Sequence, residues 1–473
     1  MNKSKIKMLL GLLSVLIVAC VVTVLVKNHE EKKEQIKNTD EVILSVDTES
    51  VTKLSWKYDD ASLSFTKNED TWNYDNDEAF PVDTEKIENL LSDFSELGAA
   101  FIIEDVEDYD QYGLEDPTCT IDITAGENTY EIKLGAFSTL DEQRYVSTGD
   151  GNVYLVSDDP FEDYEVELKD MILDDVIPNV TDIKSMTVSG EEDLTITYDE
   201  TEDLSVCADD VYYTDGKSLD TDTVASYLSN VTYLSRGDYL TYKATDSDIS
   251  KYGLDDPTVS LTIDYIETLE DESTTEGEFT LSISCDEDEL KKAKESDDES
   301  LYDEVECYAR IGESPIVYSI SYDDYDTLTK VTYNDLRHKD IMTASTDDIY
   351  EIDVTLEDKE YQFFSSETAE KNEDSSEEKT WMYGTDDDVD MSGILSAITS
   401  LKADEFISNV SKDKEEISFT VKLQNETYPE LTISLYRHDG DTCVAEVSGE
   451  VIGLIPRSQV VDLIEEVNSI ILN

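Results

Sequence analysis

The sequence predicts an α+β protein in which an N-terminal transmembrane helix precedes three related modules, each an antiparallel sheet with one packed helix. Three observations support this prediction. Residues 8–26 form an apolar run without a charged residue. The stretch YGLEDPT at residues 112–118 returns as YGLDDPT at residues 252–258, in matching surroundings, which indicates a duplicated module. Apolar and polar residues alternate with a period of two between these landmarks, which is typical of half-buried strands.

The apolar run is predicted to cross the membrane. At about 1.5 Å per residue, a helix over residues 8–26 spans about 28 Å, close to the hydrocarbon thickness of a bilayer. A cleaved signal peptide, or a lipid attached to Cys20 in the box IVAC, would need the chain to become polar earlier, whereas the run continues to Val26. The prediction is therefore an uncleaved single-pass anchor.

The orientation of the anchor follows from its short basic tail. Lysines flank both ends of the apolar run, so their count does not decide the orientation. A short basic tail followed directly by an apolar run is typical of an anchor whose C-terminal bulk is exported. Residues 1–7 are predicted to be a cytoplasmic tail, and the chain after Lys27 to be extracytoplasmic at the cell membrane. Residues 27–40 are predicted to form a charged stalk, either a solvated helix or an extended tether.

The first module is predicted over residues 41–178. Strands with period-two alternation and a short strand with Trp72 and Tyr74 precede a helix whose N-cap is Asp83. The apolar residues on one face of this helix are Ile87, Leu90, Leu91, Phe94 and Leu97. Two hairpins are predicted after the YGLEDPT turn, with their own turns at residues 125–128 and 149–152.

The second module, residues 179–342, repeats this order. SLDTDTV at residues 218–224 aligns with PVDTEKI at residues 81–87 without a gap, so Asp220 takes the place of the capping Asp83. The apolar helix positions are taken by Val224, Tyr227, Leu228, Val231 and Leu234. Apolar character is kept while the letters change, as expected for a buried helix face. Two acidic insertions, residues 267–278 and 286–303, have few apolar residues and are predicted to be mobile loops.

The third module, residues 343–473, is the most divergent. Trp381 corresponds to Trp72, and a helix is predicted after Val389 and Asp390. The apolar stripe of that helix consists of Ile394, Ala397, Ile398 and Leu401. The YGL turn is missing, residues 367–379 have a disordered composition, and residues 460–471 are predicted to form a closing amphipathic helix. The unit is therefore interpreted as a capping repeat.

The charge balance excludes one class of function. The 473 residues include 114 Asp and Glu against 35 Lys and Arg, a formal net charge of -79. Such a surface repels phosphate backbones, so nucleic acid is excluded as a partner, and it also repels anionic lipid headgroups. The acidic residues are interpreted as a solubilising face. The alternative is nonspecific binding of divalent cations, or recruitment of a basic partner.

The cysteines are interpreted as buried apolar residues. The chain has six, none of them in a CxxC pair. Cys119 shares strand parity with Ile121, and Cys285 shares it with Ile283, which favours burial. A disulfide between Cys285 and Cys307 on neighbouring strands is the alternative.

The repeated turn is given a structural interpretation. Gly113 and Gly253 are predicted to take positive φ, and the prolines of the two DPT triplets to begin edge strands without donating a hydrogen bond. The residues expected to pack on the helix are Tyr112, Leu114, Tyr252 and Leu254. The alternative is a ligand loop, which would use Glu115 and Asp116 in the first copy and Asp255 and Asp256 in the second.

No catalytic, cofactor-binding or metal-binding residue is predicted. His29 lies on the stalk, while His338 and His438 lie in polar contexts without a nucleophile motif, so all three are interpreted as surface residues. Zinc is not expected, because the sequence holds no paired His and Cys ligands. The protein is therefore predicted not to be an enzyme.

Three aspartates of the third module resemble the start of a calcium-binding loop. Asp386, Asp388 and Asp390 have the spacing of the first ligands of such a loop. However, Met391 stands where the loop needs Gly, and Ala397 stands where it needs Glu. The pattern therefore fails, and no calcium site is predicted.

Several motifs together resemble a known family. They are W-x-Y, the Asp-capped helix, YGL-x-DPT, the strand IKLG at residues 132–135, and RYV at residues 144–146. This combination is similar to the bacterial family called domain of unknown function 4340. The resemblance covers most of residues 41–177, the second module in part and the third faintly. The family has no assigned activity, so the resemblance implies no catalytic residues.

The resemblance implies a function by association. Members of the family are typically membrane-anchored and often accompany ABC-type transport systems. The expected function is a membrane-anchored extracytoplasmic accessory or binding protein whose partners are ABC permease or ATPase subunits. The first alternative is an acidic cell-surface adhesion or scaffold protein. A hydrolase is the second, and a pocket with clustered histidine and carboxylate groups would favour it.

Overall fold

The computed structural model describes residues 35–59, 61–156, 158–201, 204–268, 273–366, 379–407 and 410–472. The predicted tail, the predicted anchor, the stalk up to residue 34, Cys20 and His29 lie outside these residues, and so does most of the loop at 367–379. Among the described residues, no helix is long and apolar enough to span a bilayer. The chain divides into two compact units, Met1–Asp175 and Val176–Asn473.

The first unit contains one nine-stranded antiparallel sheet, in the order β1-β5-β9-β8-β7-β6-β2-β3-β4. Its strands are β1 (Gln35–Leu44), β2 (Val51–Tyr58), β3 (Ala61–Asn68), β4 (Thr71–Tyr74), β5 (Leu97–Glu104), β6 (Cys119–Ala125), β7 (Asn128–Ser138), β8 (Gln143–Ser147) and β9 (Val153–Val156). Its helices are η1 (Thr48–Ser50), α2 (Thr84–Ser92), η2 (Asp110–Tyr112), α3 (Phe161–Tyr164) and η3 (Leu168–Met171).

Strand β1 corrects the predicted stalk. Residues 35–40 were expected to be solvated or tethering, but they pair with β5, beginning at Gln35↔Glu104. The stretch has no apolar stripe, so periodicity did not reveal it. Backbone pairing along an available sheet edge is sufficient to form a strand, because it satisfies the backbone donors and acceptors whatever the side chains are.

The second unit contains the other two sheets. The order of the second sheet is β13-β12-β11-β10-β15-β16-β17-β18-β14. Its strands are β10 (Ile183–Ser189), β11 (Leu194–Tyr198), β12 (Tyr212–Thr214), β13 (Lys217–Ser218), β14 (Arg236–Thr241), β15 (Val259–Thr268), β16 (Thr274–Cys285), β17 (Cys307–Ile311) and β18 (Val317–Ile320). The helices beside it are α4 (Thr221–Thr232), α5 (Asp246–Lys251), α6 (Glu287–Lys294), η4 (Glu299–Glu304), α7 (Tyr322–Thr329) and α8 (Tyr333–Leu336).

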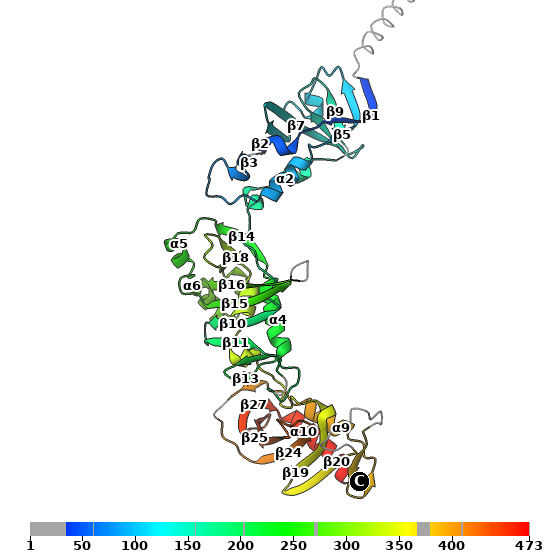
Figure 1. Cartoon of the computed structure of the whole chain (residues 1–473), viewed down its shortest axis with the longest axis vertical. Coiled ribbons are helices and arrows are strands. Elements are labelled where there is room, and N and C mark those ends of the chain that lie inside the picture. The colour runs from blue at the N-terminus through cyan, green and yellow to red at the C-terminus, as the bar shows by residue number, and fades with distance from the viewer. Residues whose placement is uncertain are drawn as a thin grey trace, which may run out of the picture. The chain divides into compact units, whose positions relative to one another are not determined.

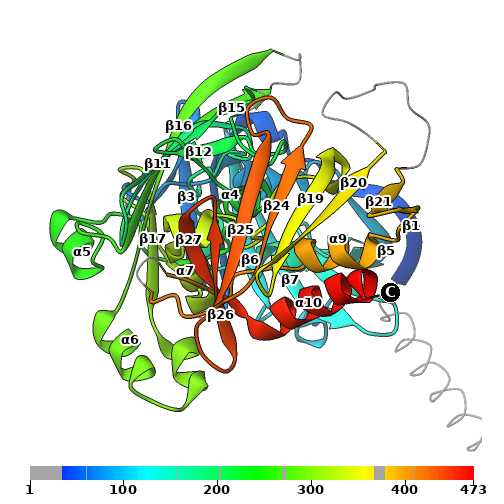
Figure 2. The ribbon, with the colours of Figure 1, turned by 90° about the horizontal axis from the view of Figure 1, so that it is seen from below.

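The third sheet has the order β22-β21-β20-β19-β24-β25-β26-β27-β23. Its strands are β19 (Ile349–Leu356), β20 (Lys359–Ser365), β21 (Trp381–Tyr383), β22 (Asp386–Asp387), β23 (Glu405–Phe406), β24 (Glu415–Leu423), β25 (Glu430–Arg437), β26 (Thr442–Val447) and β27 (Glu450–Pro456). Its helices are η5 (Thr346–Asp348), α9 (Ser392–Thr399) and α10 (Arg457–Ile471). In Figure 2, α9 and α10 lie side by side across one face of this sheet.

The three sheets share one strand order, which confirms the predicted α+β class with three antiparallel sheet modules. The second and third sheets correspond strand for strand. The first adds β1 at one edge and lacks the counterpart of β13 at the other, where only an isolated bridge joins Asn73 to Pro81. The divergence predicted for the third module therefore lies in its turns, because its strand order is the same as that of the second.

Each sheet receives one helix between corresponding strands: α2 before β5, α4 before β14, and α9 before β23. These three helices are labelled in Figure 1. The predicted stripes are all buried, at Ile87, Leu90, Leu91, Phe94 and Leu97, at Val224, Tyr227, Leu228, Val231 and Leu234, and at Ile394, Ala397, Ile398 and Leu401. The helices are shorter than these stripes: α2 ends before Phe94 and Leu97, α4 ends before Leu234, and α9 ends before Leu401. The burial of the predicted residues is confirmed, and the common helix face is confirmed for those that lie within the helices.

The predicted helix caps are also confirmed. The Asp83 carboxylate accepts a hydrogen bond from the backbone N–H of Glu85 at 2.9 Å, and Asp220 accepts one from Thr223 at 3.0 Å. Each such cap stabilises its helix by about 1 kcal/mol. In the third module the N-cap of α9 is Met391, which forms no side-chain cap, and Asp390 accepts a bond from the N–H of Ser392 at 3.0 Å.

The repeated turn does not pack on the helix, contrary to the prediction. Leu254 contacts Tyr308 and Val317, in a cluster separate from the core that contains α4. Cys307 and Ala309 belong to that core, and successive strand residues point to opposite faces, so Tyr308 lies on the other face. In the first module, Tyr112 and Leu114 likewise cluster with Ile103, Val153 and Leu155 of β5 and β9. The turn thus covers the sheet face that the helix leaves free.

The predicted role of the prolines as the start of edge strands is also wrong. Strand β6 lies between β7 and β2, and β15 lies between β10 and β16, so both strands are internal. Pro117 and Pro257 precede strands that begin at Cys119 and Val259. Because the prolines stand outside the ladder, they remove no inter-strand hydrogen bond.

The two acidic insertions are ordered elements where the structure describes them. Residues 267–268 and 274–278 extend the β15–β16 hairpin, with Thr268 paired to Thr274. Residues 286–303 form α6 and most of η4, and Asp286 caps α6 by accepting a bond from the N–H of Glu289 at 2.9 Å. Ala293 is fully buried in the core of the second sheet. A few apolar anchors and one cap are therefore enough to order a segment whose composition favours a loop.

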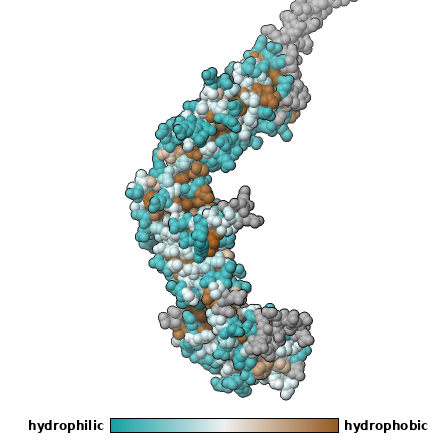
Figure 3. Space-filling view, in the orientation of Figure 1, coloured by the Kyte–Doolittle hydropathy of each residue, from teal (hydrophilic) through white to brown (hydrophobic). Residues whose placement is uncertain are grey.

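The described surface agrees with the charge balance. In the view of Figure 3, hydrophilic residues cover most of it, and hydrophobic patches are small and separated. The apolar residues are concentrated in the cores between sheets and helices.

Candidate functional site

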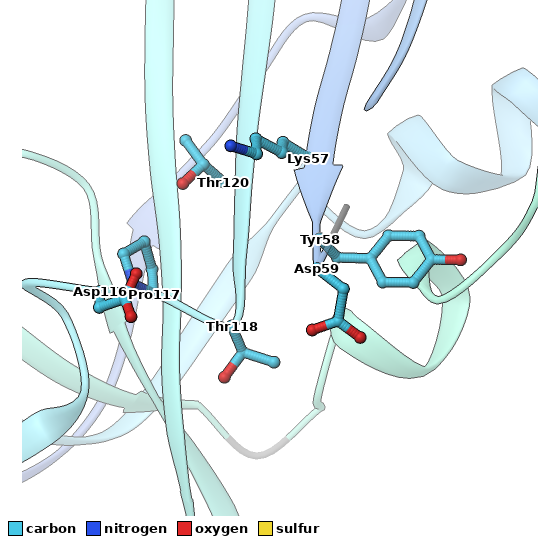
Figure 4. Close-up of a pocket in the computed structure, with 7 residues that line it drawn as sticks. All are labelled: Lys57, Tyr58, Asp59, Asp116, Pro117, Thr118 and Thr120. Atoms are coloured by element: carbon cyan, nitrogen blue, oxygen red, sulfur yellow. The ribbon is translucent and has the colours of Figure 1, made fainter. Parts of the chain in front are cut away.

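The repeated turn of the first module borders a hollow of about 690 Å³, here called the first hollow. It is lined by Lys57, Tyr58, Asp59, Asp116, Pro117, Thr118 and Thr120. Lys57 at the end of β2 and Thr120 in β6 are register partners, and Figure 4 shows the lysine amine directed toward Thr120 while the Tyr58 ring points away. The described lining contains no histidine or cysteine. It therefore offers charged and hydroxyl groups for binding.

A second hollow, of about 550 Å³, lies at the repeated turn of the second module. Its lining includes Asp256, Pro257 and Thr258, which correspond to the three DPT residues of the first hollow. The remaining walls differ, because the second hollow faces the end of β16 and the start of α6, whereas the first faces the end of β2. The DPT triplet therefore lines both hollows, whereas the residues on their other walls differ.

The two copies of the turn have the same backbone geometry. Gly113 and Gly253 have φ of 67° and 66°, the left-handed conformation that the sequence predicted. The leucine N–H of each turn donates to a carbonyl five residues earlier, at 3.1 Å in the first copy and 2.9 Å in the second. In each copy the turn tyrosine also packs on a strand tyrosine, with ring centroids 4.9 Å apart. The turn is therefore a rigid platform.

The exposed acidic residues of this platform lack an evident structural role. Asp116 and Asp256 are exposed, and no described residue forms a hydrogen bond or ion pair with either carboxylate. Glu115 is likewise exposed, whereas Asp255 accepts a bond from Ser250. These four residues form the alternative ligand loop of the sequence analysis. Asp116 and Asp256 line the two hollows, where their carboxylates are available to a cation or to a basic partner.

Other motif residues are explained by packing. A side chain at Gly135 would meet the Tyr112 carbonyl oxygen, with its Cβ 2.3 Å away, so the LG of the IKLG strand allows the turn to approach β7. The buried Arg144 of RYV donates to the Gly135 carbonyl at 2.7 Å and to the Asp159 carboxylate at 2.6 Å. These residues hold the turn in place.

A second cluster of reactive side chains lies in the second unit. His338 Nε2 is 2.7 Å from Asp210 Oδ1, and its Nδ1 is 3.5 Å from Asp220 Oδ2. One donor atom each from Cys207, Asp210 and His338 lie within 4.8 Å of one another. His338 was predicted to be a surface residue, but only 18% of its side chain is exposed. The sequence did not suggest this cluster because its members are distant along the chain.

The titration of this cluster follows from burial and charge. Burial lowers the pKa of His338, but the hydrogen bond and charge of Asp210, together with Asp220 and Asp340, raise it overall. Burial raises the pKa of Cys207 to about 11, so the thiol is protonated at neutral pH. Both ring nitrogens of His338 face carboxylates. The hydrolase alternative would need a deprotonated nucleophile in this cluster.

The remaining candidates keep structural positions. Cys119, Cys285 and Cys443 are buried as predicted for the first two, and Cys285 faces Cys307 directly across β16 and β17. Both thiols of that pair are free, so the alternative disulfide is not formed. His438, predicted to be a surface residue, is half-buried in the turn between β25 and β26.

Three sheets with one strand order, each with a helix at the same point of the chain, define a protein built from repeated α+β modules. The chain belongs to the family described as Domain of unknown function (DUF4340), whose model matches residues 72–257 and, overlapping, 213–419. The matches begin in β4 and in β12, which hold the same place in their sheets. No curated protein and no solved structure gives a match.

Proposed function

We propose that this chain is a membrane-anchored extracytoplasmic accessory protein of an ABC-type transport system, and that it binds partner subunits through its repeated turns. The apolar run at residues 8–26 supports the anchor. The association with transport rests on what the resemblance to the family implies, because the family itself is described as a domain of unknown function. On this proposal the protein has no catalytic activity. Its modules present binding surfaces to a permease or ATPase complex.

The observation that carries the proposal is the identity of the exposed residues in the two turns. The helix stripes of the first two modules keep apolar character but change most of their letters, as packing allows. Asp116 and Asp256 are identical although they are exposed and form no hydrogen bond or ion pair with described residues. Folding alone does not require aspartate there, because an exposed substitution without partners changes stability by about 0.5 kcal/mol or less. Binding of a partner to these two carboxylates would explain why both turns have aspartate at this position.

The chemistry of the platform indicates the complementary surface. Two exposed carboxylates on rigid turns favour arginine or lysine side chains of a partner, since Arg binds a carboxylate with two parallel hydrogen bonds. The formal net charge of -79 acts in the same direction, because it accelerates encounter with a basic surface and slows encounter with an acidic one. The expected partner surface is therefore basic and extracytoplasmic.

Co-purification of the full chain tests this function. The tagged protein is isolated from native membranes in mild detergent, and transport subunits are identified by mass spectrometry. The expected result is recovery of permease or ATPase subunits with the wild type, and a loss of tenfold or more with Asp116→Asn combined with Asp256→Asn. The control combines Asp70→Asn and Asp297→Asn, which change exposed carboxylates away from both hollows. Absence of transport subunits from the wild-type preparation would refute the proposal.

An acidic scaffold or adhesion protein at the cell surface is the second candidate, and the net charge favours it. On this alternative the modules act as spacers, so cell-wall polymer or another cell is bound in place of a membrane complex. The same membrane preparation distinguishes the transport accessory from the scaffold. A scaffold co-purifies with wall material, and the amount recovered is the same for the Asp116→Asn/Asp256→Asn variant as for the Asp70→Asn/Asp297→Asn control.

A further inference from the structure

The strongest unassigned feature of the structure is the group formed by Cys207, Asp210 and His338. Cys207 and Asp210 belong to the connection between β11 and β12, whereas His338 follows α8, at the end of the second module. One donor atom from each lies within 4.8 Å of the other two, which is the only such group of three among the described residues. The fold thus brings a sulfur, an oxygen and a nitrogen donor together from two distant segments.

The surroundings hold two of these donors in fixed orientations. The Asp210 side chain is fully buried, and its second oxygen accepts a bond from the Ser205 hydroxyl at 2.7 Å. The Tyr213 hydroxyl donates to the Asp210 carbonyl at 2.7 Å, which fixes the backbone. Asp220 lies 3.5 Å from the other ring nitrogen of His338. A carboxylate behind a histidine, and a hydroxyl behind a carboxylate, are the outer contacts that orient metal ligands.

We propose that Cys207, Asp210 and His338 bind a zinc ion. A mixed set of thiolate, imidazole and carboxylate suits Zn²⁺, whereas Ca²⁺ and Mg²⁺ prefer oxygen ligands only. On binding, the Cys207 thiol loses its proton to water. His338 keeps a proton on Nδ1, which faces Asp220, and gives up the proton between Nε2 and Asp210 Oδ1, so that the metal takes the place of that proton. Three protein ligands leave one tetrahedral position for water.

The group lies at the junction of the second and third modules. The Leu204 carbonyl accepts a bond from the Tyr428 hydroxyl at 2.8 Å, and Val206 packs against the core of the third sheet. The segment just after His338 pairs with the third module through a bridge from Asp340 to Lys402. An ion at this group therefore ties together two segments that both contact the third module.

Cobalt(II) replaces zinc as a spectroscopic probe in the test. The full chain in mild detergent is stripped with a chelator and titrated with Co²⁺ in excess Mg²⁺, which saturates the many surface carboxylates. The expected result is a sulfur-to-cobalt charge-transfer band that saturates at about one Co²⁺ per chain and is reversed by stoichiometric Zn²⁺. The band should vanish in Cys207→Ser and require at least tenfold more Co²⁺ in His338→Gln and in Asp210→Asn.

Cys443→Ser is the matched control, because it removes another buried thiol and should leave the titration unchanged. Circular dichroism of each variant checks that the sheets are retained. Two outcomes overturn the proposal: the absence of a charge-transfer band in the folded wild type, and a band that persists in folded Cys207→Ser. If His338→Gln or Asp210→Asn is unfolded, the titration of Cys207→Ser alone decides whether the proposal holds. This variant should stay folded, because serine is close in size to cysteine.

Discussion

Asp93 in the first module should make the stability of its sheet depend on pH. Its carboxyl lies at the C-terminal end of α2, beside a hollow of about 250 Å³ that Asp158 and Asp163 also line. One carboxyl oxygen is buried without a hydrogen-bond partner among the described residues. Burial, followed by the negative charges of Asp163 and Asp158, raises the pKa of Asp93 to about 7. The helix C-terminus also disfavours a negative charge.

The sign of the effect follows from linkage. The folded pKa is raised above the unfolded value, so between the two values the folded chain binds more protons than the unfolded chain, and stability falls as pH rises toward 7. Above the pKa of the folded state, the loss of stability is complete and no longer changes with pH. At about 1.36 kcal/mol per pH unit, the free energy of unfolding falls by about 2 kcal/mol between about pH 5.5 and pH 7. Solvent screening of this half-buried group reduces the expected effect to about 1 kcal/mol.

Asp93→Asn removes the titration and keeps the side-chain shape. Relative to the wild type, this variant should gain about 1 kcal/mol more stability at pH 8 than at pH 5.5. Urea unfolding followed by tryptophan fluorescence measures the gain. A Trp381→Phe background leaves Trp56 and Trp72, which both report on the first unit. Asp70→Asn, an exposed change in the same unit, should show no such difference between the two pH values. An Asp93→Asn effect that is equal at both would refute the reasoning.

Two further predictions concern the second module, and both are measured by urea unfolding. An alanine in the left-handed conformation lowers the free energy of unfolding by about 1–2 kcal/mol. Gly253→Ala should lower it by more, because the added Cβ would lie 2.6 Å from the Ser284 hydroxyl. Gly216→Ala, at φ +76° in open space, is the control and should lower it by that amount only. Equal costs would exclude the close contact. Tyr227→Phe should lose about 1–2 kcal/mol, since the buried hydroxyl donates to the Leu328 carbonyl at 2.9 Å; no change would show that water replaces it.

The sequence was sufficient for features that depend on local pattern. The stripe of α4 was placed by period and by its gapless alignment with α2, and Asp220 was placed as its cap, because both depend on residues within a few turns of each other. The positive φ of Gly113 and Gly253 was predicted for the same reason. The whole strand order could not be read from period-two alternation, since alternation shows that a strand is half-buried and does not name its neighbours.

Errors arose where long-range contacts decide the outcome. The YGL turn has an apolar tyrosine and leucine, which the sequence assigned to the helix, but they pack on the opposite sheet face because the helix already covers the first. Strand β1 and helix α6 have compositions that favour solvent, and pairing partners far along the chain order them. The cluster at His338 depends on Asp210, which is distant in sequence, so no local motif indicates it.

The proposed docking through the repeated turns is tested most directly by crosslinking in the native membrane. A photoreactive amino acid is placed at the exposed position 115, which leaves Asp116 intact, and at position 70 as the exposed control in the same module. The proposal predicts that a permease or ATPase-complex subunit is crosslinked from position 115 and not from position 70. Crosslinks from position 115 to wall material alone, or equal yields of the same subunit from both positions, would contradict it.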